Sequence, residues 1–358
     1  MPVMTALLLY IGTYTTDGKS GGIYAVPFDP AAGTFGEPRV AAAATNPTFL
    51  VRSPDRRFLY SLDEAGTVGG RPGGAISAFA IDAAGGLTRL NSSASGGIGG
   101  AHAALDATGR TATLISYHGS YIASFSVGAD GRIGAPASSF PVTGKLGPVT
   151  DRQDKPHPHS LTFSPDNRFA YVCDLGTDTI LRYRLDPATS RLSLDGSTTT
   201  TPGDGPRHSK FSADGRFYYV INELGGSISA YSCEPTTGAL HLLQSVATLP
   251  ADFKGTNTCA EIRLHPNGRF IYGSNRGHDS LVVFSCDPQT GLLARVQIEP
   301  SGGGHPRNFA LSADGRWLIC ANRDANNLVL FAVDADTGRL TPTGRTVTVP
   351  QPVCVLMP

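Results

Sequence analysis

A short motif that recurs about every 50 residues constrains the fold of this chain more than any other feature. In its clear copies, Ser or His precedes a turn rich in Pro, Asp, Asn and Gly, and an apolar run follows. These copies are SPDRRFLYSLDE from residue 53, SPDNRFAYVCDL from 164, SADGRFYYVINEL from 212, HPNGRFIYGSNRG from 265 and SADGRWLICANRD from 312, with DATGRTATLISYH from 106 as a degenerate copy. Internal repetition at this period is typical of propeller blades.

Each copy predicts four strands. One apolar run ends at the turn, a second run follows it, and a polar cluster such as NELGG or NRGHD comes next. A third run alternates, as in ISAYSCE and LVLFAVD, before a turn of the form D-x-x-T-G-x-L. Alternation with a period of two indicates strands, and no long window has the 3.6-residue period of a helix. The sequence therefore predicts an all-β chain of four-stranded antiparallel blades.

The two ends of the chain supply a further blade. LLLYIGTYTTD near the N-terminus matches the second strand of a repeat, and PVCVLMP at the C-terminus matches the first strand. Pairing these segments would leave no free sheet edge in the ring. We expect residues 1–358 to form a single seven-bladed β-propeller domain, closed by the C-terminal strand joining the N-terminal blade.

Composition excludes several classes of protein. The 29 basic residues balance 29 acidic ones, whereas a nucleic-acid-binding protein usually has a basic surface. No segment approaches the roughly 20 apolar residues that span a membrane, and the N-terminal apolar run is more typical of a strand than of a signal peptide. The six cysteines are scattered without a C-x-x-C motif, which predicts buried free thiols and a cytoplasmic location.

The first strand of each blade is expected to line the central channel. We compared the residue that stands five positions before the first residue of each turn. The series is Thr48, Ala101, His159, Arg207, Ala260, Arg307 and Val353. Three blades therefore place His or Arg at one level of a narrow channel. The next position adds His102, His208, Glu261 and Asn308.

The end of each second strand gives another series. Its pairs are Thr13-Tyr14, Asp63-Glu64, Ser116-Tyr117, Asp174-Leu175, Asn222-Glu223, Asn275-Arg276 and Asn322-Arg323. Asp and Asn at the first position are suited to cap the turn by bonding local backbone. The second position varies with the blade, which favours a functional site.

Structural roles compete with the functional ones at these positions. His159 could be a strand-end histidine bonded to a carbonyl of the next blade, and His157 lies two residues earlier, near the start of the strand. Arg207, Glu223 and Arg276 could form an ion-pair network between blades.

Several motifs at these positions resemble the seven-bladed lactonase family, which includes propeller-type 6-phosphogluconolactonases and fungal 3-carboxy-cis,cis-muconate lactonising enzymes. They are YIGTYT near the start, PHPHS around His159, GPRH around Arg207, INEL around Glu223, AEI around Glu261, SNRG around Arg276 and HPRNF around Arg307. The resemblance covers essentially the whole chain.

The resemblance implies an active site made of a histidine, a glutamate and two arginines. The matching positions are His159, Glu223, Arg207 and Arg276. We further expect substrate binding by neighbouring polar residues, namely His102, Glu64, Glu261, Arg307, Asn275 and His157. The Pro- and Gly-containing insertion at residues 138–156 is expected to cover one mouth of the channel.

The resulting hypothesis is a hydrolase that opens a small anionic sugar lactone, with 6-phosphogluconolactone as the first candidate. One arginine would stabilise the oxyanion and the other would hold the phosphate, while either His159 or Glu223 activates water. No cofactor or metal is expected, because the chain has neither a D-x-D-x-D-G run nor zinc-like His and Cys spacing.

Two alternatives remain open at this stage. One is a cycloisomerase that interconverts a carboxymuconate and its lactone. The other is a non-catalytic propeller that binds a partner protein, although the WD dipeptide of such scaffolds does not occur in this sequence. We expect a monomer or a weak homodimer.

Overall fold

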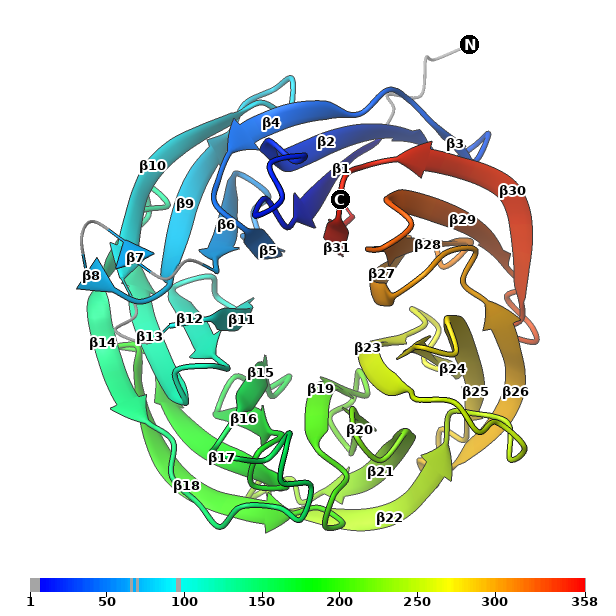
Figure 1. Cartoon of the computed structure of the whole chain (residues 1–358). Coiled ribbons are helices and arrows are strands. Elements are labelled where there is room, and N and C mark those ends of the chain that lie inside the picture. The colour runs from blue at the N-terminus through cyan, green and yellow to red at the C-terminus, as the bar shows by residue number, and fades with distance from the viewer. Residues whose placement is uncertain (1–6, 65–66, 69–70, 95–97, 358) are drawn as a thin grey trace.

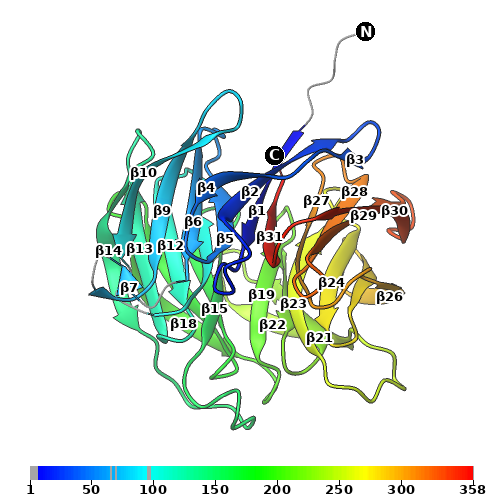
Figure 2. The same ribbon diagram turned by 45° about the horizontal axis from the view of Figure 1, so that its top comes forward.

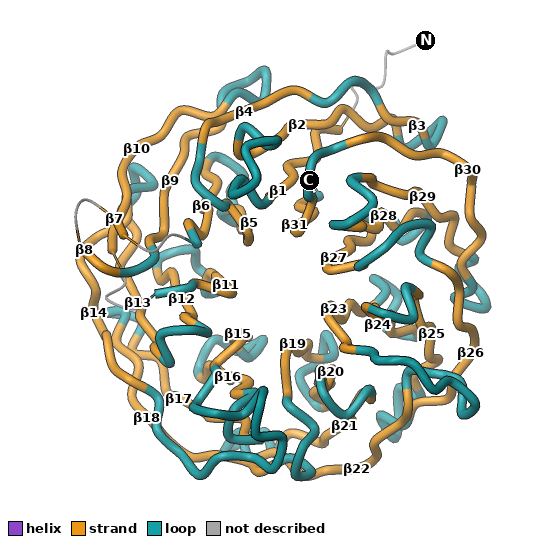
Figure 3. The backbone as a smooth tube through the Cα atoms, in the orientation of Figure 1, coloured by secondary structure: helices purple, strands orange, loops and turns teal. Residues whose placement is uncertain are grey.

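Seven antiparallel sheets stand around a central axis in the computed structural model (Figure 1). The structure describes residues 7–64, 67–68, 71–94 and 98–357. Strands and loops make up this described part, which contains no helix (Figure 3). The predicted seven-bladed propeller is thereby confirmed. Within the described ranges, no helix is long and apolar enough to cross a membrane.

Each blade runs outward from the channel as four successive strands. The innermost strands are β5 (Pro47–Arg52), β11 (Gly100–Leu105), β15 (Pro158–Phe163), β19 (Pro206–Phe211), β23 (Thr258–Leu264), β27 (Pro306–Leu311) and β31 (Pro352–Leu356). The second strands are β1 (Leu7–Thr13), β6 (Phe58–Asp63), β12 (Thr111–Ser116), β16 (Phe169–Asp174), β20 (Phe217–Asn222), β24 (Phe270–Arg276) and β28 (Trp317–Asn322).

The third strands pack behind these. They are β2 (Gly22–Asp29), β9 (Ala75–Ile81), β13 (Tyr121–Val127), β17 (Thr179–Asp186), β21 (Ser227–Cys233), β25 (Ser280–Cys286) and β29 (Asn327–Val333). The outer strands are β10 (Leu87–Ala94), β14 (Ile133–Pro141), β18 (Arg191–Thr199), β22 (Leu240–Ala247), β26 (Leu293–Pro300) and β30 (Leu340–Thr348). In the N-terminal blade two short strands share the outer place, β3 (Thr34–Phe35) and β4 (Arg39–Ala43). In the chain, a small hairpin of β7 (Thr67–Val68) and β8 (Arg71–Pro72) connects β6 to β9.

The ring closes where the two ends of the chain meet. Strand β31 pairs antiparallel with β1, with Ile11 opposite Val355 and Gly12 opposite Cys354. A Cβ atom on Gly12 would lie 2.2 Å from the carbonyl oxygen of Pro47, so only glycine allows β1 to approach the neighbouring blade this closely. The C-terminal strand therefore completes the N-terminal blade, as the sequence predicts.

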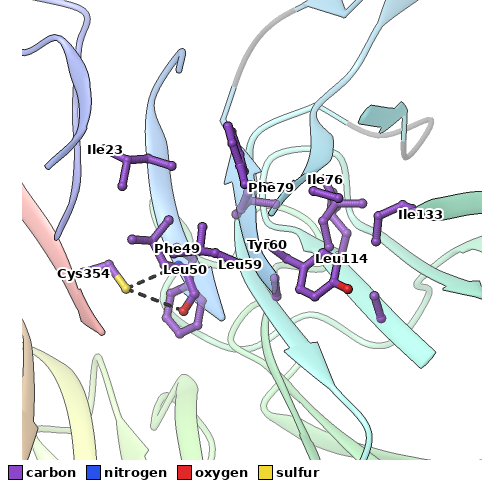
Figure 4. Close-up of a cluster of buried hydrophobic side chains, with 14 of the residues drawn as sticks. Ile23, Phe49, Leu50, Leu59, Tyr60, Ile76, Phe79, Leu114, Ile133 and Cys354 are labelled. Atoms are coloured by element: carbon purple, nitrogen blue, oxygen red, sulfur yellow. Dashed lines mark hydrogen bonds between the residues drawn. The ribbon is translucent and has the colours of Figure 1, made fainter. Parts of the chain in front are cut away.

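The closing strand also packs against the blade that follows. The Sγ atom of Cys354 lies 3.3 Å from the backbone nitrogen of Leu50, which donates a hydrogen bond to it (Figure 4). Leu50 and Cys354 belong to a buried cluster with Ile23, Phe49 and Leu59. Apolar contacts of this kind, made between neighbouring blades, form the core.

The recurring Ser-x-Asp-x-Arg motif is a turn structure. Ser53 Oγ donates to Asp55 Oδ1 at 2.6 Å, and Arg57 Nε donates to Asp55 Oδ2 at 2.6 Å. The backbone nitrogen of Phe58 donates to Ser53 Oγ at 3.0 Å. The same bonds recur at Ser164, Ser212 and Ser312. The motif that reveals the repeat thus shapes the link between first and second strands and carries no chemistry of its own.

Removing the closing strand should unfold the ring. Truncation after residue 349 exposes the inner edge of β1 and removes Val353, Cys354 and Val355, which are all buried. Burying one such side chain contributes about 1.5–3 kcal/mol, so the loss is comparable to the whole stability of many domains. We expect aggregation or a thermal midpoint far below that of the full chain, measured by circular dichroism. A chain shortened only by its last two residues is the control, and equal midpoints for both truncations would contradict this role.

Candidate active site

A β-bulge at the same position of every innermost strand selects the side chains that face one mouth of the channel. The pairing register shifts at Thr48, Ala101, His159, Arg207, Arg307 and Val353, and across Ala260-Glu261. A bulge re-aims a side chain out of the regular alternation. We call this end, where the innermost strands begin, the site mouth. The opposite end, which holds the Ser-x-Asp turns, is the turn mouth.

A cavity of about 280 Å³ lies at the site mouth. Its lining comes from all seven blades and from one loop, and the residues are Tyr14, Glu64, Gly100, Ala101, Tyr117, His118, Arg152, His159, Glu223, Arg276 and Arg307. The long connection between β14 and β15, residues 142–157, brings Arg152 to this cavity, and Figure 2 shows the connection as a green loop beyond one end of the ring. The predicted insertion therefore covers this mouth, although it begins after Pro141 because β14 continues that far.

Glu223 stands at the centre of a group of arginines. Its Oε2 atom accepts from Arg207 Nε at 2.7 Å and lies 3.0 Å from Arg276 Nη2. Its Oε1 atom accepts from Arg152. Burial alone would raise the pKa of Glu223, but Arg276 and Arg207 outweigh this effect and hold the pKa well below its usual range. Glu223 is therefore a carboxylate at neutral pH.

Arg207 and Arg276 also link two neighbouring blades. Arg207 Nη1 donates to the carbonyl oxygen of Ala260 in the next blade at 2.6 Å, and Arg276 reaches back to Glu223 while its Nη2 donates within its own blade to the carbonyl oxygen of Cys259 at 2.7 Å. Arg207 is only 2% exposed and does not line the cavity. Burial, together with the charge of Arg276, lowers the pKa of Arg207 to about 9, which leaves it charged at pH 7. These contacts are those of an ion-pair network between blades, and Arg276 extends the network into the cavity.

His159 faces the same carboxylate. Its Nε2 atom lies 3.9 Å from Glu223 Oε2. Its Nδ1 atom is fully buried and has no hydrogen-bond partner among the described residues, so the expected alternative of a bond to a neighbouring carbonyl is not observed there. Burial and the nearby charge of Arg207 lower the pKa of His159 well below its ordinary value. The ring is neutral at pH 7, and Nε2 is the nitrogen left to meet a ligand.

Arg307 is the uncommitted cation of the cavity. Its guanidinium carbon lies 5.6 Å from the centre of the Tyr14 ring, and within the described ranges the guanidinium makes no hydrogen bond or ion pair. Glu64 lies on the same cavity wall. Five N–H donors without acceptors, in a concave site, are suited to bind a phosphate or carboxylate.

Comparison with known proteins agrees with this geometry. The sequence model of the family described as "Lactonase, 7-bladed beta-propeller" matches residues 8–357. The chain belongs to this family. The 6-phosphogluconolactonase of Bacillus subtilis is 36% identical over 353 residues, which is 98% of each chain, and that of Formosa agariphila is 34% identical over 85% of this chain and 86% of its own. The crystal structure of the periplasmic gluconolactonase PpgL of Pseudomonas aeruginosa has a TM-score of 0.91, with 32% identity and 99% coverage of both chains.

Two predicted binding residues of this lactonase family member lie outside the cavity, in structural positions. The ring of His157 stacks on Tyr117 at 4.2 Å, and its Nε2 atom lies 2.8 Å from Asp154 Oδ1, so His157 anchors the long loop. Asn275 Nδ2 donates to Ser280 Oγ at 3.2 Å and to the carbonyl oxygen of Thr248 at 3.3 Å, so Asn275 ties its turn to a distant segment instead of bonding the local backbone as expected.

His102 and Glu261 lie deeper in the channel and do not line the site cavity either. Glu261 Oε2 lies 3.3 Å from His208 Nδ1 and accepts from Asn308. The centre of the His102 ring lies 4.2 Å from that of Phe49, with the two rings tilted, and 5.3 Å from that of His208. These residues fill the middle of the channel and separate its two mouths.

Four lining residues with polar side chains were not predicted from the sequence as site residues. Tyr14 and Tyr117 stand in the variable series at the ends of the second strands, so their position was a usable signal. His118 follows directly after Tyr117. Arg152 had no signal, because it belongs to no repeat, and only the path of the 142–157 loop brings it to Glu223.

Stability should fall as the pH drops below about 6.5. His102, His159 and His208 are buried, and burial lowers the pKa of each well below 6.5. The unfolded state then binds protons that the folded state does not bind. Each of these histidines therefore lowers the free energy of unfolding by up to about 1.4 kcal/mol for every pH unit below its unfolded pKa. We expect the thermal midpoint to decline from pH 6.5 towards 4.5, and His208→Asn should reduce the slope.

His241→Asn, which changes an exposed histidine, is the matched control and should leave the slope unchanged. A thermal midpoint that stays constant over this pH range would contradict the neutral, buried state of the three rings.

Proposed function

We propose that this lactonase hydrolyses 6-phosphogluconolactone to 6-phosphogluconate. The observation that supports this most directly is a surplus of cations in a small cavity that also holds a neutral histidine. Arg152, Arg276 and Arg307 line the cavity with Glu64 and Glu223, and Arg207 lies directly behind Glu223. A cavity with excess positive charge attracts an anionic substrate and raises its local concentration.

The donors of the arginines suggest how the substrate is held. Arg276 directs Nε to the carbonyl of Thr258 and Nη2 to that of Cys259, so Nη1 is the nitrogen without a partner among the described residues. We assign this group to the oxyanion that forms at the lactone carbonyl. Arg307, with all its donors uncommitted, is assigned to the phosphate, where a planar fork binds two oxygens at once.

His159 is better suited than Glu223 to be the general base. A carboxylate whose pKa is held far below 4.5 by arginines is a weak proton acceptor, whereas a neutral imidazole has a free lone pair at pH 7. In the proposed reaction Nε2 takes a proton from the attacking water, and the new C–O bond gives a tetrahedral oxyanion. The same nitrogen then returns the proton to the ring oxygen as the ester C–O bond breaks.

Glu223 then acts on the histidine rather than on the water. Its carboxylate, 3.9 Å from Nε2, stabilises the imidazolium that forms during each proton transfer. Arg207 keeps this carboxylate in place from the buried side. The product acid ionises at neutral pH and releases one proton to solvent, which balances the hydrolysis.

The names of the relatives support a sugar lactone but differ about phosphate. The Bacillus and Formosa proteins are 6-phosphogluconolactonases, whereas the Pseudomonas protein is a gluconolactonase. Arg307 and Arg152 favour the phosphorylated substrate for this chain. The Pseudomonas relative is periplasmic, but six free cysteines, five of them buried, favour the cytoplasm here. We also propose a monomer or weak homodimer.

The substrate can be tested with two lactones. Purified protein should accelerate loss of 6-phosphogluconolactone over spontaneous hydrolysis, with a chelator making no difference. Arg307→Met should raise KM for this lactone about 10- to 100-fold, since a charged hydrogen bond is worth about 1.5–3 kcal/mol, and should change glucono-lactone hydrolysis much less. Arg152→Met should act in the same direction, and Arg339→Met, at an exposed arginine, is the control.

Equal effects of Arg307→Met on both lactones would exclude a phosphate role for Arg307. No acceleration of either lactone, together with turnover of a carboxymuconate, would favour a cycloisomerase instead. Activity lost with chelator and restored by calcium would overturn the metal-free mechanism; no group of three or more potential metal ligands occurs in the described part of the chain.

Proton transfer by His159 and stabilisation of its imidazolium by Glu223 can be distinguished from purely structural roles. His159→Asn and Glu223→Gln keep the side-chain shapes, so we expect folded protein whose turnover is lower by about 10²- to 10⁴-fold. The acid limb of kcat/KM in the unmodified protein should lie below pH 6.5, because His159 becomes protonated only there. His241→Asn and Glu234→Gln are matched controls at exposed positions.

A purely structural network would give the reverse pattern, with lower thermal midpoints and near-normal turnover in the folded fraction. Normal turnover in both His159→Asn and Glu223→Gln would refute the site.

A further inference from the structure

A second and larger cavity opens at the turn mouth of the channel. Its volume is about 670 Å³, and it is lined by the ends of the innermost strands and by residues of the Ser-x-Asp turns. Phe49, His102 and His208 fill the channel between this cavity and the site cavity. None of the residues assigned to lactone hydrolysis lines it.

The charge of this cavity is entirely positive. Arg52, Lys210 and Arg263 line it, and among the described residues no Asp or Glu does. Lys210 and Arg263 occupy equivalent positions on the adjacent strands β19 and β23, two residues before the turn. The seven residues at this level are Val51, Ala104, Thr162, Lys210, Arg263, Ala310 and Leu356. Five blades thus place a small or uncharged residue where two neighbouring blades place cations.

Only one of the two cations has a carboxylate nearby, and that carboxylate also meets other residues. Arg263 Nη2 lies 3.6 Å from Glu261 Oε2, an atom that also accepts from Asn308 and lies near His208. The Nζ atom of Lys210 has no hydrogen bond or ion pair to any residue in the described ranges. Burial, followed by repulsion from Arg263, lowers the pKa of Lys210 to about 8. A partly buried ammonium without a partner is costly, and an oxyanion between the two cations would reduce that cost.

We propose that the turn-mouth cavity is a second anion site, in which a phosphate or carboxylate group binds between Lys210 and Arg263. The guanidinium of Arg263 supplies planar donors, and the ammonium of Lys210 supplies a point charge. The rest of the wall is mainly apolar and includes Leu50, Leu161 and Leu264, with polar side chains such as Thr162 and Ser312 between them. The ligand is therefore a small organic anion whose charged group meets the two cations and whose body contacts the apolar wall.

Amine labelling can report directly on Lys210. In the Arg307→Met variant, which weakens anion binding at the site mouth, the rate of Lys210 acetylation by acetic anhydride is followed by peptide mass spectrometry. The probes are inorganic phosphate and butyrate. We expect saturable protection of Lys210 by one of them, because a bound anion keeps the amine protonated and covered. Protection by phosphate alone identifies a phosphate site, and protection by butyrate alone identifies a carboxylate site.

Calorimetric titration of the protecting probe provides the second measurement. Lys210→Met and Arg263→Met should each weaken its binding about tenfold or more, since each removes a charged contact. Methionine suits the apolar surroundings, and circular dichroism verifies the fold of each variant. Lys254→Met, at an exposed lysine, is the matched control and should bind normally. Absence of saturable protection by either probe, or equal binding by Lys210→Met and Lys254→Met, would overturn the proposal, and neither result bears on lactone turnover.

Discussion

The pairing of β31 with β1 is the contact on which the rest of the molecule depends. Each blade is a small sheet whose faces are buried only because other blades stand on both sides. In a closed ring every blade has both faces buried. An open array would instead expose one face of each terminal blade to water, together with the strand edge of β1 that β31 covers. Because β31 comes from one end of the chain and β1 from the other, closure also fixes the circumference. The channel and both of its mouths exist only as a consequence of that closure.

Within the closed ring, one local irregularity converts a structural repeat into a place for chemistry. The bulge in each innermost strand re-aims a side chain, and the seven blades present five different residue types at this position. Where the residue is Ala or Val the channel is merely filled. Where it is His159 or Arg307, a polar group meets others from neighbouring blades. Variation at one register position is thus sufficient to build a site without altering the repeat.

Electrostatics distinguishes the two ends of the channel. At the site mouth, cations surround the buried carboxylate of Glu223, and this arrangement keeps the glutamate ionised and the adjacent His159 neutral. At the turn mouth, Lys210 and Arg263 face a cavity with a mainly apolar wall, and their positive charge is balanced only in part, by Glu261 near Arg263. In the middle layer His208 and Glu261 lie close together. The low dielectric of the interior makes each of these charges act strongly on its neighbours, so the two mouths are suited to bind anions.

The sequence by itself determined the repeat, the four strands of each blade, the closure and the register that places His159, Arg207 and Arg307 in equivalent positions. These follow from local rules, since turn chemistry and alternation depend on residues that are near in sequence. The same rules placed Glu223 and Arg276 at strand ends, and the resemblance to lactonases gave these positions a candidate role. Only the tertiary structure decided that Arg152 reaches Glu223 from a loop outside the repeat, that His157 and Asn275 hold a loop and a turn in place, and that Glu261 meets His208 in the middle of the channel. Such contacts join residues from different blades, and their distances depend on the closure of the ring and on how the side chains pack across the channel, which no local pattern encodes.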